Sequence, residues 1–171
     1  MGHKDHKEEA KAKARCFIIT VSDTRTPETD TSGKLIGEKL REAGHVVVSI
    51  VILPDEPTVV KEKVLIESQR TDIDAIILNG GTGISERDST FEAIEILLKK
   101  KLPGFGELFR YLSYNDIGSA AMMSRATAGV RNGKLIFSIP GSTGAVSLAL
   151  EKLIIPELSH MLWELRKHIK A

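Results

Sequence analysis

Strand-like and helix-like segments alternate from residue 15 onward, and this alternation restricts the possible folds more than any other feature. Short runs rich in Val and Ile are typical of buried strands, and apolar residues three or four apart are typical of helices. The predicted strands are residues 15–21, 45–53 and 73–79, and the predicted helices are residues 31–43, 57–70 and 89–100. Because strands separated by helices pair in parallel with right-handed crossovers, we expect a three-layer α/β/α fold.

The second half of the chain is less regular. Pro103-Gly104-Phe105-Gly106 is expected to break the pattern before a short helix over residues 107–114, and residues 120–125 to form another helical turn. Residues 127–131 and 134–139 flank Asn132-Gly133, a dipeptide typical of hairpin turns. One antiparallel strand is therefore expected in the mostly parallel central sheet, followed by helices over residues 145–154 and 156–170.

Composition limits the classes of function. The formal net charge of the 171 residues is +1, which argues against a nucleic-acid partner. No apolar run approaches the roughly 20 residues that span a bilayer, and no signal peptide is evident, so we expect a cytoplasmic protein without a membrane partner. We interpret residues 1–14 as a flexible polar arm and residues 15–171 as one domain. Cys16, the single cysteine, lies in an apolar run and is predicted to be a core residue.

A glycine-rich turn follows the third predicted strand. Gly80, Gly81 and Gly83, with Thr82 between them, would let the backbone approach phosphate oxygens, and free N–H groups there would carry partial positive charge. Strand-to-helix turns are also glycine-rich for steric reasons alone, so the turn by itself leaves both interpretations open. It matches neither the P-loop pattern nor the full dinucleotide-binding fingerprint.

Polar residues follow four of the predicted strands. Because ligands bind beyond the carboxyl ends of parallel strands, we expect these residues to meet in one crevice. They are Ser22 and Asp23, Asp55, the glycine turn with Arg87 and Asp88, and Pro140, Gly141 and Ser142. Each group has a structural alternative, since Ser22 and Asp23 can shape a turn, Asp55 can stabilise a helix start, and Ser142 can cap a helix.

The carboxylates of Asp55 and Asp88 are hard oxygen ligands of the kind that Mg²⁺ prefers, and Mg²⁺ commonly arrives with substrate phosphates. Arg87 would neutralise phosphate charge, although an exposed arginine can also be solvated or paired with Glu86. The sequence offers no persuasive hydrolytic triad, because His45 and His160 fall where packing or solvent exposure is the expected role.

Six short segments together resemble the MoaB/MogA family of molybdenum cofactor biosynthesis proteins, which is related to the G domain of gephyrin. The resemblance covers approximately residues 16–155. The segments are residues 21–23, 54–56, 79–83 with 87–88, 103–107, 124–125 and 140–142.

The resemblance implies a molybdopterin-binding fold and an adenylyltransferase that moves AMP from ATP to molybdopterin and releases pyrophosphate. Two acidic positions of the family correspond to Asp55 and Asp88, which we assign to catalysis and Mg²⁺ binding. Nucleotide or phosphate binding is assigned to Gly80, Gly81, Thr82, Gly83 and Arg87, and molybdopterin binding to Ser22, Asp23, Pro140, Gly141 and Ser142. Because some relatives keep the fold without adenylyl transfer, a non-catalytic molybdopterin carrier is the alternative.

The resemblance also implies a homo-oligomer, either a trimer or a hexamer, and a downstream molybdenum-insertion protein as a partner. Phe105, Phe109, Tyr111 and Leu112 are candidates for the subunit interface, and equally for the core of the monomer. A mainly architectural oligomer is a third possibility, but the chain lacks the long linkers and additional domains of a scaffold.

Overall fold

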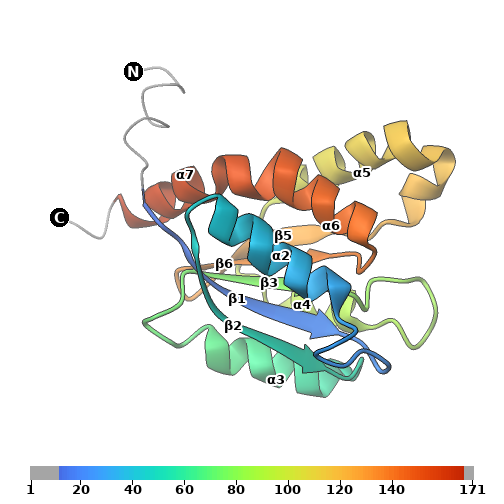
Figure 1. Cartoon of the computed structure of the whole chain (residues 1–171), viewed down its shortest axis with the longest axis horizontal. Helices are drawn as coiled ribbons and strands as arrows, with labels where there is room; N and C mark the ends of the chain where they lie inside the picture. Colours follow the sequence, from blue (N-terminus) through green and yellow to red (C-terminus); the bar gives the residue numbers. More distant parts are fainter. Residues whose placement is uncertain (1–11, 168–171) are drawn as a thin grey trace.

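A mixed sheet runs through the middle of the molecule (Figure 1). It has six strands in the order β2-β1-β3-β6-β5-β4. The structure, a computed structural model, describes residues 12–167. The strands are β1 (Arg15–Val21), β2 (Val46–Leu53), β3 (Ala75–Asn79), β4 (Lys100–Lys101), β5 (Thr127–Arg131) and β6 (Lys134–Ile139). Strands β2, β1, β3 and β6 pair in parallel, whereas β5 runs antiparallel to both of its neighbours. The predicted fold class is confirmed.

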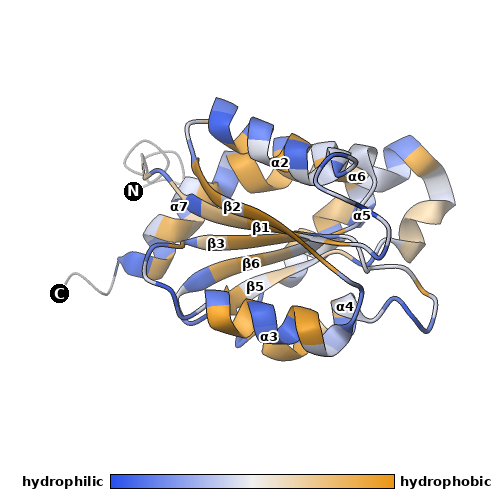
Figure 2. Cartoon of the chain, turned by 60° about the horizontal axis from the view of Figure 1, so that its bottom comes forward, coloured by the Kyte–Doolittle hydropathy of each residue, from blue (hydrophilic) through white to orange (hydrophobic). Residues whose placement is uncertain are grey.

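Helices cover both faces of the sheet. They are α2 (Thr31–Glu42), α3 (Pro57–Glu67), α4 (Thr90–Leu97), α5 (Pro103–Ile117), α6 (Thr143–Ala149) and α7 (Ile155–Arg166), with a 3-10 helix at Gly118–Met123 and a π-helical turn at Leu150–Ile154. Helices α3 and α4 lie on one face, and α2, α5, α6 and α7 lie on the other (Figure 2).

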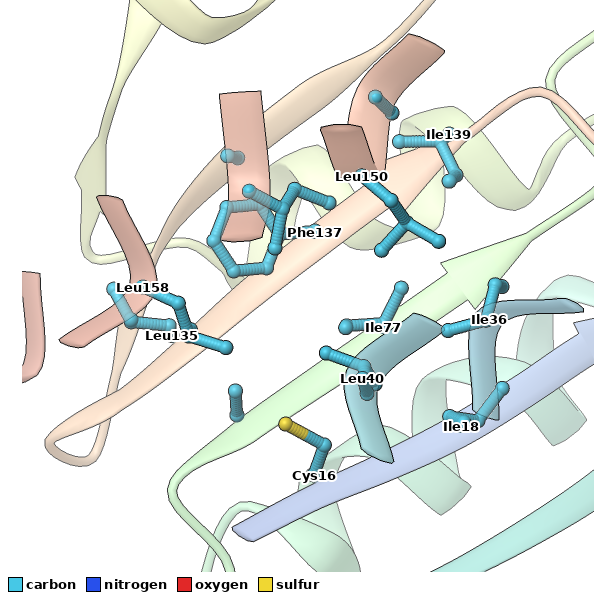
Figure 3. Packing of buried hydrophobic residues seen from close by; sticks show 14 of the residues in the cluster. Cys16, Ile18, Ile36, Leu40, Ile77, Leu135, Phe137, Ile139, Leu150 and Leu158 are labelled. Carbon is cyan, nitrogen blue, oxygen red and sulfur yellow. The ribbon is translucent and has the colours of Figure 1, made fainter. Parts of the chain in front are cut away.

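Strand β1 shows why the core has two halves. Cys16 and Ile18 face the layer that contains α2, whereas Phe17 and Ile19 face the layer that contains α3, as expected for a parallel strand buried on both sides. Figure 3 shows Cys16 among the apolar side chains of α2, β3 and β6. Cys16 is fully buried in this cluster, so the predicted core role is confirmed, and burial raises the pKa of its thiol to about 12. Each fully buried Ile or Leu here stabilises the fold by about 1.5–3 kcal/mol.

Helix α5 begins at Pro103, so the prediction of a break over residues 103–106 was wrong. Proline is well tolerated in the first helical turn because its missing N–H has no partner there anyway. Gly106 is buried, and a Cβ at that position would lie 2.6 Å from the carbonyl oxygen of Ala126. This glycine therefore serves a close approach between helix and strand, which the sequence pattern made look like a turn.

Helix α4 also differs from the prediction, since it ends at Leu97 and Lys100 belongs to the short strand β4. Ser89 makes no side-chain capping bond; its Oγ donates to the carbonyl of Arg87 (3.3 Å). Glu92, the expected partner in a capping box, pairs with Arg125 instead. At the other end of the chain, the π-helical turn connects α6 directly to α7. The last predicted helix covers residues 156–170, and its part beyond residue 167 lies outside the described residues.

A buried carboxylate joins β1, β3 and α7 at the amino edge of the sheet. Asp74 Oδ2 accepts hydrogen bonds from the backbone N–H (2.8 Å) and Nε (2.9 Å) of Arg15, and Oδ1 pairs with Nη2 of Arg15 (2.8 Å) and of Arg166. Burial alone would raise the pKa of Asp74, but the hydrogen bonds and charges of both arginines hold it below its usual value. The carboxylate therefore remains ionised, with only 2% of its side chain exposed.

Residues 1–11 of the predicted arm lie outside the described part of the chain. Ala14 is fully buried, and its N–H donates to Nδ1 of His45 (3.1 Å), which gives that histidine a packing role. Of the interface candidates, Phe109 belongs to the core and Phe105 packs edge-on against Phe137 (5.4 Å between ring centroids), whereas Tyr111 is 70% exposed. None of the helices within residues 12–167 is long and apolar enough to cross a membrane.

Candidate active site

The connections that leave the carboxyl ends of β1 and β3 run in opposite directions along the sheet. From β1 the chain passes through α2 to the outer strand β2, and from β3 it passes through α4 to β4 at the opposite edge. Adjacent loops that leave in opposite directions open a crevice in which α/β proteins bind ligands. Strand β6 lies beside β3 and ends at the same edge, so Pro140, Gly141 and Ser142 join the crevice.

Asp23 connects three of the loops that were predicted to converge. Its Oδ1 accepts the backbone N–H of Asp55 (3.1 Å), and its Oδ2 pairs with Nε (2.9 Å) and Nη2 (2.8 Å) of Arg87. The N–H of Asp55 and then the guanidinium of Arg87 hold the pKa of Asp23 below its usual value. Ser22 shapes its own turn, since its Oγ accepts the N–H groups of Thr24 (3.2 Å) and Arg25 (3.1 Å).

The carboxylate of Asp55 lies near two other carboxylates, those of Asp23 and Asp88. Its Oδ1 accepts a hydrogen bond from Oγ1 of Thr90 (2.8 Å), which fixes the carboxylate. Partial burial raises the pKa of Asp55, the charges of Asp88 and Asp23 raise it further, and the Thr90 hydrogen bond and Arg87 oppose the shift. The two carboxylates that were predicted to act together are therefore close enough for their charges to repel each other.

Close packing around the turn requires glycine at residues 80, 81 and 83, and the turn also leaves backbone N–H donors without protein acceptors. Gly80 has φ +98°, and a Cβ there would overlap the carbonyl oxygen of Val21. Gly81 has φ +65°, and a Cβ there would lie 2.5 Å from Oγ1 of Thr90, while a Cβ on Gly83 would overlap the Asp88 carboxylate. Within residues 12–167, the N–H groups of residues 81–83 donate to no protein acceptor. The steric and the anion-binding interpretations are thus compatible.

Arg87 lies on the exposed part of the same loop, and Asp88, which follows it, is half-buried. Oγ of Ser85 donates to Oδ2 of Asp88, and the N–H of Asp88 donates to the carbonyl of Ser85 (3.0 Å), which closes a short turn. Arg87 is paired with Asp23 and lies 3.9 Å from Glu56, so its partner is not the neighbouring Glu86 that we considered. With 65% of its side chain exposed, Arg87 remains accessible to an anionic ligand.

The turn after β6 packs directly against the glycine turn. A Cβ on Gly141 would lie 3.1 Å from the Cα of Gly80, and the carbonyl of Gly141 accepts a hydrogen bond from Oγ of Ser32 (2.7 Å). Ser142 caps α6, since its Oγ accepts the N–H of Ala145 (3.2 Å), as the structural alternative predicted.

Three cavities adjoin along this edge of the sheet. A polar cavity of about 140 Å³ is lined by residues that include Ser22, Asp30, Asn79, Gly80 and Gly141. A more apolar cavity of about 690 Å³ shares Ser22 with it and reaches Pro54, and one of about 190 Å³ is bordered by Pro140 and Ser142. Asp55 and Asp88 line none of these three, so the carboxylate pair lies beside the crevice and not inside it.

Arg125 and Thr90 are site residues to which the sequence analysis gave no role. Thr90 looked like part of a helix start, but its hydroxyl holds Asp55. Arg125 binds the carbonyl oxygens of Thr82 (3.1 Å) and Asp88 (2.9 Å). It stands at this edge because β5 runs antiparallel, so that the residues before β5, and not those after it, face the crevice. Arg125 lies in the segment of residues 124–125 that resembles the family, and this was the signal in the sequence that could have identified it as a site residue.

Comparison with known proteins agrees with this arrangement. The family model described as a probable molybdopterin binding domain matches residues 17–160. The chain belongs to the MoaB/MogA family. It is 56% identical to molybdenum cofactor biosynthesis protein B of Bacillus subtilis, over 98% of this chain and 99% of that protein. The resemblance seen in the sequence is thereby confirmed.

Solved structures of MoaB/MogA proteins share the fold. The crystal structure of a molybdenum cofactor biosynthesis protein B superposes with a TM-score of 0.89 at 52% identity, covering 91% of this chain and 98% of that chain. The tungsten cofactor synthesizing protein MoaB from Pyrococcus furiosus superposes with a TM-score of 0.79 at 37% identity, covering 90% of this chain and 98% of that chain.

Proposed function

We propose that this member of the MoaB/MogA family transfers AMP from ATP to molybdopterin in the biosynthesis of the molybdenum cofactor, with Mg²⁺ as the metal cofactor. The observation that carries the proposal is the position of Asp55 and Asp88 beside the free N–H groups of residues 81–83. The high identity to a relative named for this pathway supports the biosynthetic role.

The reaction requires no covalent enzyme intermediate. A phosphate oxygen of molybdopterin attacks the α-phosphorus of ATP and forms a new P–O bond, while the bond from that phosphorus to the bridging oxygen breaks and pyrophosphate leaves. The attacking phosphate is already anionic near neutral pH, so no general base is needed. The protein must bring two anions into line and offset their charge, which is work for backbone donors, basic side chains and a cation.

Backbone and side-chain donors would hold the phosphates. The N–H groups of Gly81, Thr82 and Gly83 point from a turn without protein acceptors and are suited to phosphate oxygens. Arg87 has a guanidinium fork that binds phosphate through charge-assisted hydrogen bonds once it leaves Asp23. Ser22, Asp23 and the turn of residues 140–142 border the adjoining cavities, where we place molybdopterin.

The donor set fits Mg²⁺. Asp55 and Asp88 offer only oxygen ligands, and the pKa of Asp55 is raised first by burial and then by the neighbouring carboxylates, a field that a bound cation would relieve. Within residues 12–167, no group of three or more His, Cys, Asp or Glu side chains is arranged to hold a metal unaided. Asp55 and Asp88 would therefore share the ion with substrate phosphates. When bound, Mg²⁺ neutralises phosphate charge and fixes phosphate orientation.

The test is formation of adenylylated molybdopterin and pyrophosphate from purified full-length protein, molybdopterin and ATP, with and without Mg²⁺. We expect product only with Mg²⁺. The Asp88→Asn variant should lose at least about a hundredfold in rate, because it loses an anionic ligand of the Mg²⁺ that would offset the phosphate charge, while its affinity for molybdopterin changes little. Asp72→Asn is the matched control, since Asp72 is a 55% exposed carboxylate beside Arg70, outside the candidate site.

Two results would contradict the proposal. Binding of molybdopterin without any product, in the presence of ATP and Mg²⁺, would indicate the carrier function instead. A rate in Asp88→Asn equal to that of the wild type would remove Asp88 from the metal site, even if the transferase activity itself is found.

A further inference from the structure

Arg125 binds both ends of the loop that carries Asp88, which we call the Asp88 loop (residues 82–88). Its Nε donates to the carbonyl of Thr82 (3.1 Å), and its Nη2 donates to the carbonyls of Gly83 and Asp88 (2.9 Å to the latter). One guanidinium thus fixes the first two residues and the last residue of the loop. All three contacts are to backbone carbonyl oxygens, and the Asp88 side chain takes no part in them.

The Asp88 loop has little other attachment to the rest of the protein. Residues 83–87 are exposed, and Ile84, the largest apolar side chain of the loop, is 70% exposed. The hydrogen bonds between Ser85 and Asp88 close a turn inside the loop without joining it to the sheet. The Arg87–Asp23 ion pair does join it to the loop after β1, but both side chains are exposed, and such pairs contribute little.

Arg125 itself lies against the first turn of helix α4, shortly before strand β5 in the chain. Its Nη1 pairs with Glu92, and its guanidinium carbon lies 4.9 Å from the ring centroid of Phe91, so two residues of the first turn of α4 hold it. The next residue, Ala126, is buried immediately before β5. Only 23% of the Arg125 side chain is exposed. The loop is therefore attached, through one side chain, to elements that belong to the core.

We propose that Arg125 is a positioning residue for adenylyl transfer: it holds the Asp88 loop so that the Asp88 carboxylate stays beside Asp55 and the N–H groups of residues 82 and 83 stay free. This inference rests on the proposed transferase function. Arginine is suited to the task because its planar fork donates to several carbonyl oxygens at once, whereas the single ammonium of lysine cannot span them. Arg125 touches no reacting atom and acts only through the loop.

The first test measures loop opening without any substrate. In Arg125→Ala, we expect the amide of Asp88, whose N–H donates to the carbonyl of Ser85, to exchange about ten- to a hundredfold faster, because the loop opens more often once the hydrogen bonds from Arg125 are lost. Arg131→Ala is the matched control: Nη1 of Arg131 also donates to a backbone carbonyl, that of Leu97 (2.9 Å), but at the far end of α4. The control should leave exchange in the Asp88 loop unchanged.

The second test concerns the reaction. In Arg125→Ala, we expect a lower kcat and a higher Mg²⁺ concentration for half-maximal rate, both partly restored by added guanidinium ion, whereas Arg125→Lys remains impaired. Unchanged loop exchange in Arg125→Ala would overturn the inference, as would faster exchange spread equally over all peptides, which indicates a general loss of stability. If the wild type forms no product, the proposed function fails, and the exchange comparison alone decides whether Arg125 holds the loop.

Discussion

Replacement of Asp74 by Asn should destabilise the protein without altering the candidate site. The Asp74 side chain is 2% exposed and pairs with Arg15 and Arg166, whose side chains are 41% and 40% exposed. The arginines can recover hydration, and Asn keeps one acceptor, so the loss lies near the lower end of the range for breaking a buried ion pair, about 3 kcal/mol. For a chain of this length, that corresponds to a fall in Tm of about 6–12 °C.

The pH dependence gives a sharper test of the same reasoning. The folded pKa of Asp74 is lowered, so its ionised form stabilises the fold fully above the unfolded pKa of about 4. This contribution is lost as the pH falls from there through the folded pKa. The difference in free energy of unfolding between the wild type and Asp74→Asn should therefore be greatest near neutral pH and shrink in acid.

Urea unfolding followed by the fluorescence of Trp163, the single tryptophan, measures this difference at each pH. Asp72→Asn serves as the control, because its ion pair with Arg70 is exposed to solvent and should contribute little to stability. Equal stability of Asp74→Asn and the wild type at neutral pH would refute the reasoning. A difference that stays constant into strong acid would show that the charge of Asp74 is not its source.

Two further predictions concern the candidate site. Asp55→Asn should raise Tm near neutral pH while abolishing adenylyl transfer. The raised pKa of Asp55 means that its ionised form is unfavourable in the free protein, and the variant removes that charge. Thermal unfolding should show the gain in Tm fading as the pH falls from the folded pKa of Asp55 toward its unfolded pKa. Gly81→Ala should cost about 1–3 kcal/mol and weaken ATP binding, because φ is +65° and the new Cβ would crowd Thr90. Gly104→Ala, in helix α5 with nothing within 4 Å of the new Cβ, should be neutral or slightly stabilising in urea unfolding, and equal stability of the two variants would contradict this reasoning.

The fold was predictable where periodicity and turn chemistry agreed. Strands β1, β5 and β6 occupy the expected residues, and Asn132-Gly133 forms the expected hairpin. The prediction failed at Pro103 and Gly106, because a glycine that serves a close helix–strand approach looks the same in sequence as one that ends a helix. The expected capping box failed for a similar reason: a distant partner, Arg125, takes the side chain of Glu92.

The convergence of site residues was predictable from topology, but their pairing was not. Parallel strands end at one edge, so Asp23, Asp55 and Asp88 had to approach one another there. The bond from Asp55 to Asp23 spans 32 positions in the chain and that from Arg87 to Asp23 spans 64, and no local pattern encodes such contacts. The roles assigned to these residues in catalysis and in binding stay predictions, with the experiments above as their tests.

The reversed course of β5 has a practical consequence for labelling and protein engineering. Because β5 runs against β6, the Asn132-Gly133 hairpin projects from the edge opposite the crevice, where β6 begins. A fluorescent tag or an affinity peptide inserted into that hairpin would stay clear of the candidate site. The segment of residues 123–126 enters the same strand from the other side, so even a single inserted residue there would displace Arg125 relative to the Asp88 loop.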